Sequence, residues 1–175
     1  MSTHEDAERT KKYITEALFQ LMKTTPYEKI TILEIAKKAG VGRVTYYRHF
    51  KSKNDIIIQY FSKETAAFAL LFPKKPQTKD DYYELLFTVF HFLREKKELM
   101  QLIQKAGLEM IYLDFLNQTL LENFEVSQRK ETVYSAYYAA GCLFNVSMQW
   151  VKNDCKESVK FIADTYYEHV FSDFN

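Results

Sequence analysis

Apolar residues recur at intervals of three and four along nearly the whole chain, and this spacing predicts amphipathic α-helices. Only 4 glycines and 3 prolines among the 175 residues interrupt the pattern. We therefore expect an all-α protein of about nine helices. Beyond the first three helices, the expected ranges are residues 53–71, 80–95, 99–106, 110–124, 131–153 and 157–171.

The first three helices have clear start and stop signals. The first ends before Pro26, because the residue preceding a proline is pushed out of helical geometry. Thr31 and Glu34 have the spacing of a capping box, which starts a second helix. Gly40 can take the left-handed conformation that ends this helix, and a third is expected to begin at Arg43. Two helices joined by a short glycine turn make a helix-turn-helix.

Basic residues are concentrated in this segment. From Lys29 to Lys53 there are seven Lys and Arg residues, and Glu34 is the only acidic residue, whereas the whole chain has a net charge of +1. Such a local excess is typical of a nucleic-acid contact, in which Lys and Arg displace counterions from phosphates; a solvated helix face is the alternative. In the third helix Tyr46 and Phe50 are four residues apart and are expected to face the core. The rest of that helix would then lie on the surface.

A second capping box is expected after the third helix. Ser52 and Asp55 have its spacing, so a fourth helix should start at about Lys53. Its unpaired backbone NH groups would face the same side as the outer surface of the third helix, where a phosphate could bind.

Residues between Thr10 and Ile57 have the spacing of a known family. They are Thr10, Ile14, Ala17, Leu21, Ile30, Thr31, Ile35, Ala36, Ala39, Gly40, Val41, Thr45, Tyr47, His49, Phe50 and Lys53. At these positions the chain resembles the DNA-binding domain of the TetR family of bacterial transcriptional regulators. The resemblance implies a helix-turn-helix domain over residues 1–52 and a helical regulatory and dimerisation domain over residues 53–175.

The resemblance also implies roles in DNA binding. Arg43 and Thr45 match positions from which the family contacts bases; Arg43 would either pair with a guanine or contact a phosphate. Val44 replaces a common glycine and would either touch a thymine methyl or hold Arg43 away from the base pair. Tyr47 matches a backbone-contacting position, with core packing as the alternative. The predicted DNA contacts are Thr31, Arg43, Val44, Thr45, Tyr47, Arg48, His49, Lys51 and Lys53.

The helix expected over residues 131–153 is apolar nearly all round, so it needs partners on two sides. One side would pack within its own domain, and the other, with the last helix, would pack against a second copy as a four-helix bundle. A monomer that buries both sides is the alternative. The predicted homodimer contacts are Tyr137, Ala140, Gly141, Phe144, Met148, Ile162, Tyr166 and Val170.

An apolar pocket with a few hydroxyls and one imidazole is the candidate ligand site. Its predicted lining is Phe61, Phe68, Phe87, Phe90, His91, Tyr112, Phe115, Tyr134 and Tyr138. Ordinary core packing is the alternative for each of them, and for His91 this means a hydrogen-bonded core histidine. In the family a ligand in the C-terminal domain tilts the fourth helix. The resemblance therefore implies a homodimeric repressor that a small apolar or aromatic ligand releases from a nearly palindromic, double-stranded DNA operator.

Two other functions remain open. The run from Tyr137 to Trp150 also resembles a TetR subgroup of low-GC Gram-positive bacteria, some of whose members resemble co-activators. A DNA-binding co-activator controlled by a protein partner is therefore an alternative. A helical carrier of lipids or small molecules that does not bind DNA is another.

Motifs of enzymes, metal sites and export are not found in the sequence. It lacks G-x-S-x-G, H-E-x-x-H and a Walker loop, and its 4 histidines have no partner at metal-ligand spacing. Its 2 cysteines fall outside any C-x-x-C pattern, the N-terminus is polar and acidic, and no apolar run approaches the length of a membrane span. We therefore expect a cytoplasmic protein with free cysteines, no enzymatic activity, and no cofactor or metal.

Overall fold

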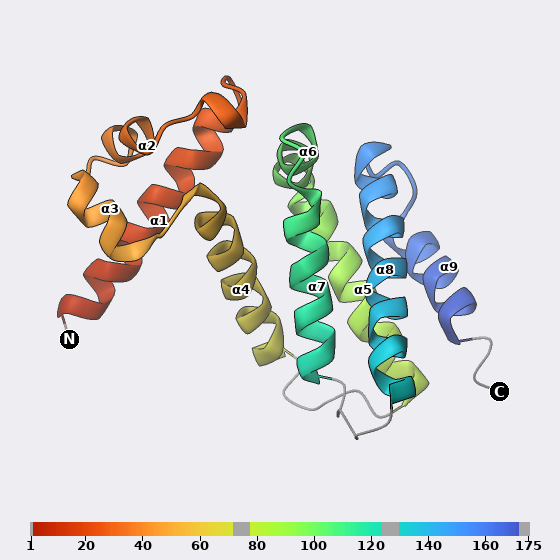
Figure 1. Ribbon diagram of the computed structural model, residues 1–175. Helices are drawn as coiled ribbons and strands as arrows, with labels where there is room; N and C mark the ends of the chain where they lie inside the picture. Colours follow the sequence, from red (N-terminus) through yellow and green to blue (C-terminus); the bar gives the residue numbers. More distant parts are fainter. Residues whose placement is uncertain (1, 72–77, 124–129, 172–175) are drawn as a thin grey trace.

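In the computed structural model, which describes residues 2–71, 78–123 and 130–171, every regular element is a helix (Figure 1). The α-helices of these ranges are α1 (Ser2–Met22), α2 (Ile32–Lys38), α3 (Arg43–His49), α4 (Lys53–Leu71), α5 (Lys79–Glu95), α6 (Lys97–Lys105), α7 (Glu109–Asn123), α8 (Lys130–Lys152) and α9 (Val159–Phe171). The predicted all-α class is confirmed, and the later helices begin and end within two residues of their expected positions.

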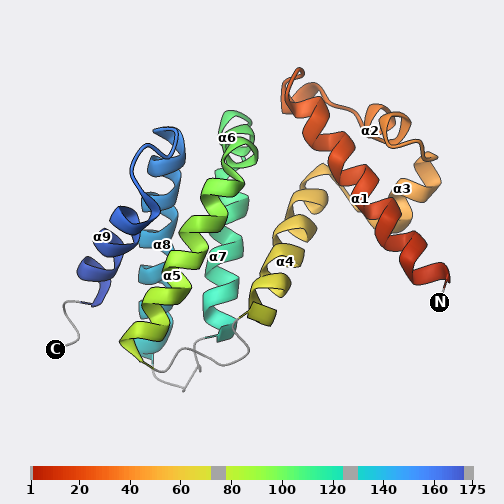
Figure 2. The same cartoon turned by 180° about the vertical axis from the view of Figure 1, so that it is seen from behind.

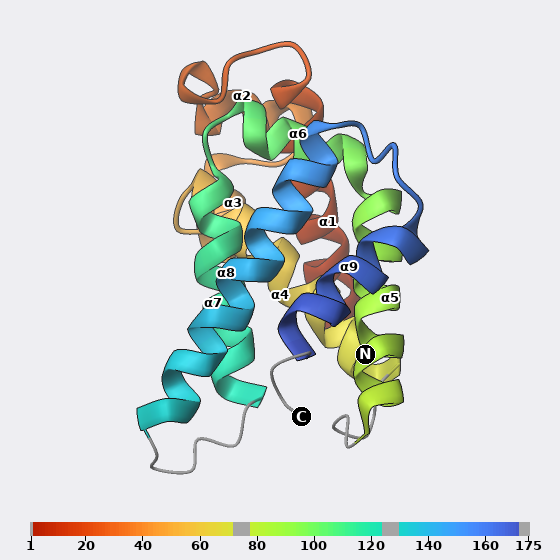
Figure 3. The same ribbon diagram turned by 90° about the vertical axis from the view of Figure 1, so that its right-hand side faces the viewer.

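The helices form two groups that α4 connects. Helices α1, α2 and α3 lie at one end, and α5 to α9 form a bundle at the other (Figures 1 and 2). Within the bundle α7 packs against α8 and α5 against α9, while α4 packs against both α1 and α7. The end of the molecule seen in Figure 3 presents α8 and α9, opposite the end that carries α3. The predicted recognition helix and the two last helices therefore lie far apart.

Local hydrogen bonds explain why α2 and α3 begin and end where they do. The Thr31 hydroxyl accepts from the Glu34 amide at 3.2 Å, and the Glu34 carboxylate accepts from the Thr31 amide at 2.8 Å, which confirms the predicted capping box. Gly40 follows α2 with φ of 70°, a conformation that costs little only for glycine. Gly42 then precedes the first residue of α3 without a side-chain cap.

The start of α4 differs from expectation in one detail. Ser52 accepts from the Asp55 amide at 3.1 Å as predicted, but the Asp55 carboxylate accepts from the amide of Lys51 at 2.7 Å instead of from that of Ser52. The reciprocal bond is thus shifted by one residue towards the end of α3. A short 3-10 helix, η1 (Tyr27–Lys29), lies where the sequence indicates only a loop, because three residues are too few to show a period.

Trp150 anchors the core of the bundle. Its side chain is almost fully buried, and its ring meets that of Phe90 edge-on with centroids 5.9 Å apart. The indole NH donates to the carbonyl of Glu157 at 3.2 Å, which ties the end of α8 to the segment that leads into α9. Through these two contacts, Trp150 of α8 is joined to α5 and to the segment that precedes α9.

Membrane-spanning helices and metal-ligand clusters are both absent from the described ranges. None of their helices combines the length and the apolar character needed to cross a bilayer. Nor do three or more His, Cys, Asp or Glu side chains in these ranges converge so as to hold a metal ion.

Candidate nucleic-acid interface

Helix α3 is anchored on one side and open on the other. Tyr46 and Phe50 are buried, as the spacing predicts, and they hold the helix against the core of the N-terminal group. Arg43, Val44 and Tyr47 lie on the exposed side, where Val44 is 77 % exposed. Figures 1 and 2 place this helix at the end of the molecule away from α5 to α9. A duplex can therefore approach α3 without meeting the bundle.

Arg43 and Tyr47 support each other on this exposed side. The Arg43 guanidinium carbon lies 6.0 Å from the centroid of the Tyr47 ring, at the limit of a cation–π contact. The Tyr47 ring in turn meets the buried Tyr46 edge-on at 5.4 Å. Tyr47 therefore packs partly on the core and partly beneath Arg43, while half of its surface stays exposed.

Several basic side chains near α3 are available for an external partner. Arg48 and Lys51 are exposed, and within the described ranges neither they nor Arg43 take part in an ion pair. Thr45 is half-buried on the same helix. The structure thus brings together most of the residues that the sequence assigns to DNA.

Thr31 and Lys53 differ, because their polar atoms are engaged inside the protein. The Thr31 hydroxyl completes the capping box and also donates to the Glu34 carboxylate at 2.7 Å. The Lys53 ammonium donates to two main-chain carbonyls, those of Tyr27 and Ile30, each at 2.7 Å. Sequence spacing places both residues at helix starts and predicts the Glu34 partner of Thr31. It cannot reveal the two carbonyls that bind the Lys53 ammonium.

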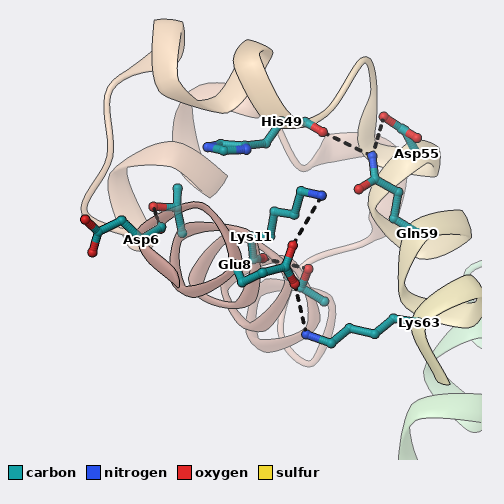
Figure 4. Close-up of polar contacts among 9 residues, drawn as sticks. Asp6, Glu8, Lys11, His49, Asp55, Gln59 and Lys63 are labelled. Carbon is teal, nitrogen blue, oxygen red and sulfur yellow. Dashed lines mark hydrogen bonds and ion pairs between the residues drawn. The ribbon is translucent and has the colours of Figure 1, made fainter. Parts of the chain in front are cut away.

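His49, the last residue of α3, is hydrogen-bonded to α4 (Figure 4). Its carbonyl accepts from Gln59 Nε2 at 3.1 Å, and the same amide nitrogen donates to Asp55 Oδ2 at 3.2 Å. Burial lowers the pKa of the His49 imidazole below its usual value, and the nearby charges of Lys11 and Arg48 lower it further. The ring is therefore mainly neutral at pH 7, and it can offer one NH to a phosphate.

Glu8 forms two ion pairs below His49, one within α1 and one that joins α1 to α4 (Figure 4). The Glu8 carboxylate lies 3.5 Å from the Lys11 ammonium on its own helix and 3.3 Å from that of Lys63 on α4. The bond to Lys63 contributes most to lowering the pKa of Glu8. Since these groups are well exposed, the pairs add little stability.

The nine residues predicted to line one ligand pocket are dispersed in the structure. Phe61 stacks with Phe115 at 5.5 Å and lies 5.4 Å from Tyr112, so these three form an aromatic cluster between α4 and α7, in which Phe61 and Tyr112 are buried and Phe115 is half-buried. Phe90 is buried elsewhere, between Trp150 and Tyr166.

The other predicted lining residues lie outside any shared pocket. Tyr134 and Tyr138 are 73 % and 60 % exposed, Phe87 is also exposed, and His91 lies on the surface 3.4 Å from Glu95. The side chain of Phe68 lies outside the described residues. Helical spacing identifies an apolar face but does not tell which neighbour covers it, and for this reason the predicted set combined separate faces.

Two hollows on the described residues are open depressions. One lies between α7 and α8 and is lined by Asp114, Asn117, Gln118, Leu121, Glu122 and Tyr137. The other lies on α5 and is lined by Tyr83, Glu84, Phe87 and Thr88.

The residues predicted for the homodimer divide into buried and accessible ones. Ala140, Met148, Ile162 and Tyr166 are buried within the single chain, where the Tyr166 hydroxyl donates to the carbonyl of Ala139 at 3.0 Å. Gly141 and Phe144 are half-buried, Tyr137 is exposed, and the side chain of Val170 lies outside the described residues. Among the described residues of α8 and α9, the exposed large apolar side chains are those of Tyr134, Tyr137, Tyr138 and Phe161.

The sequence is similar to that of known regulators. Residues 14–60 match the family model described as bacterial regulatory proteins, tetR family. An HTH-type transcriptional regulator of Staphylococcus aureus (strain USA300) is 30% identical over 166 residues, which cover 91% of this chain and 76% of that protein.

Solved structures show the same fold at lower identity. The transcriptional regulator FadR from Bacillus subtilis, in complex with stearoyl-CoA, matches with a TM-score of 0.59 and 23% identity over 90% of this chain and 96% of that one. The dihydroxyacetone kinase operon activator DhaS matches with a TM-score of 0.59 and 18% identity over 94% and 95%.

Proposed function

Because the chain belongs to the tetR family of bacterial regulatory proteins and is a DNA-binding transcriptional regulator, we propose that it acts as a homodimeric repressor on a nearly palindromic operator. Residues 1–52 bind DNA, and residues 53–175 dimerise and receive the signal. The observation that carries the proposal is the exposed face of α3, where Arg43 lies over Tyr47. Arg43 and Thr45 contact bases, whereas Tyr47, Arg48, His49 and Lys51 contact the sugar-phosphate backbone.

Two copies impose a geometry on the operator. Two recognition helices that read the same face of a duplex lie about 34–36 Å apart, or a multiple of that distance. Selection of binding sites from a random duplex library should therefore enrich two inverted half-sites, with centres about 10–10.5 base pairs or a multiple apart. The variant Arg43→Ala/Tyr47→Ala should enrich no such motif, whereas Lys152→Ala, at an exposed lysine of α8, should select like the wild type. Enrichment of a single half-site, or of no motif by the wild type, would contradict the proposal.

We assign the exposed aromatic surface of α8 and α9 to the homodimer. Tyr138 and Phe161 are 60 % and 57 % exposed, and large apolar side chains on a surface are typical of interfaces. At micromolar concentration, sedimentation should show a species of twice 20.8 kDa. Tyr138→Ser/Phe161→Ser should shift it towards the monomer, whereas Tyr13→Ser, at an exposed tyrosine of α1, should not. A wild type that sediments only at 20.8 kDa would refute the homodimer.

The signal is proposed to be a small apolar or aromatic ligand. The aromatic cluster of Phe61, Tyr112 and Phe115 supports this, because it joins α4, which leads to the DNA-binding helices, to α7. The similar FadR of B. subtilis was solved with stearoyl-CoA. A ligand that separates these rings would shift α4, and it can do so only by as much as it prefers the shifted state.

A DNA-binding co-activator controlled by a protein partner is the second candidate. The two open hollows of the described residues favour the co-activator. An open depression does not enclose a small molecule, whereas a protein partner can dock on it. DhaS, which shares the fold, is named an operon activator. Transcription from a promoter that contains the selected site distinguishes the two candidates. Repression by the protein alone supports the repressor, and activation that requires a partner protein supports the co-activator.

A further inference from the structure

The ammonium of Lys53 is surrounded by protein groups. Its Nζ atom lies 2.7 Å from the carbonyl oxygen of Tyr27, 2.7 Å from that of Ile30 and 4.4 Å from the centroid of the Tyr27 ring. A lysine ammonium has three donor hydrogens and no acceptor. Two of these bond to the carbonyls, and the ring face is a third partner at cation–π distance. The charge therefore already has partners within the protein.

Tyr27 holds the next residue of α4 as well. Its hydroxyl donates to Asn54 Oδ1 at 2.6 Å, while its ring and carbonyl contact Lys53. The Tyr27 side chain is buried, so the ring has little freedom to move. One aromatic residue of η1 thus binds the first two residues of α4, although they are 26 and 27 positions away in sequence.

The same turns of α4 are also bonded to the end of α3. Gln59 donates to the carbonyl of His49 (Figure 4). The Asp55 carboxylate accepts from the amide of Lys51. Helix α4 is therefore held on one side by η1, which leads directly into α2, and on the other by α3. A displacement of the start of α4 must carry both DNA-binding helices with it.

We propose that Tyr27, Lys53 and Asn54 form a clamp that sets the position of η1 and α2 on α4, and that Lys53 supports DNA binding as a positioning residue instead of contacting a phosphate. This inference rests on the proposed DNA-binding function. Lys53 then belongs to the contact between α4 and η1, through which a movement of α4 reaches the helix-turn-helix.

Lys53→Met tests the clamp, because it keeps the length of the side chain and removes the ammonium. Affinity for the selected site should fall about tenfold, the effect of losing one hydrogen bond to a charged group. The slope of log affinity against log salt should stay that of the wild type, whereas loss of a phosphate contact would reduce its magnitude by about 0.9. Lys51→Met, at an exposed lysine two positions earlier, shows the slope change that loss of a surface charge produces.

Tyr27→Phe and Asn54→Ala provide the uncharged arm of the test. Each variant removes the hydrogen bond between the Tyr27 hydroxyl and the Asn54 side-chain oxygen and leaves the net charge unchanged. Each should therefore lower DNA affinity several-fold, roughly as expected for one neutral hydrogen bond, and leave the salt slope unchanged. Affinities are measured at a temperature at which circular dichroism shows every variant fully folded. If these residues only stabilised the fold, the affinities would then equal that of the wild type. A Lys53→Met slope reduced by about 0.9 per protomer, or wild-type affinity in Tyr27→Phe and Asn54→Ala, would overturn the clamp. Failure of the wild type itself to bind any duplex would instead refute the proposed function.

Discussion

The Trp150→Ala variant is expected to lose about 3–5 kcal/mol of free energy of unfolding. Removal of the buried indole leaves a cavity where Phe90 packs edge-on against it, and it leaves the carbonyl of Glu157 without its donor. Since a domain of this kind is stable by only about 5–15 kcal/mol, the loss is a large part of the total. Denaturation by urea, followed by far-ultraviolet circular dichroism, measures it as a lower midpoint at an unchanged slope.

An exposed apolar residue provides the control for this experiment. Met110 lies on α7 with more than half of its surface exposed, so Met110→Ala should change the free energy of unfolding by less than about 0.5 kcal/mol. If Trp150→Ala lost no more than Met110→Ala, the packing of α5, α8 and α9 described above would be incorrect.

Arg43→Ala is expected to relax the sequence preference at one base pair of each half-site and to weaken operator binding by about 1–3 kcal/mol per half-site. The reason is the exposed guanidinium of Arg43, which Tyr47 supports and which is free of ion pairs within the described ranges. Competition binding with operators that differ by single base pairs measures the effect. The wild type should discriminate against one substitution that Arg43→Ala accepts.

Arg48→Ala is the matched control, because Arg48 lies on the same helix and is assigned to the backbone. It should weaken all sequences alike and reduce the magnitude of the salt slope by about 0.9 per lost contact. Should Arg43→Ala show this uniform pattern and Arg48→Ala the selective one, the two roles would have to be exchanged.

The parts of the fold that the sequence predicts well are those with local causes. The capping box of Thr31 and Glu34 and the left-handed Gly40 act within a few residues of themselves, so the starts and ends of α2 and α3 follow from the sequence. The burial of Tyr46 and Phe50 follows from helical spacing for the same reason.

The parts that the sequence does not predict depend on distant neighbours. The spacing places Lys53 at the start of α4, but the carbonyls that bind its ammonium come from residues more than twenty positions earlier. Tyr134 and Tyr138 belong to an apolar face of α8, yet more than half of each side chain is exposed. Pattern alone could not separate such a surface from the lining of a pocket.

The dependence of DNA affinity on salt tests the central claim most directly. If the basic face around α3 binds a duplex, the logarithm of the affinity of the wild type for its selected site should fall linearly with the logarithm of salt concentration, by about 0.9 per phosphate contact and hence by several units for a homodimer. Fluorescence anisotropy of a labelled duplex between low and physiological salt provides the measurement. An affinity that does not change with ionic strength would contradict the account.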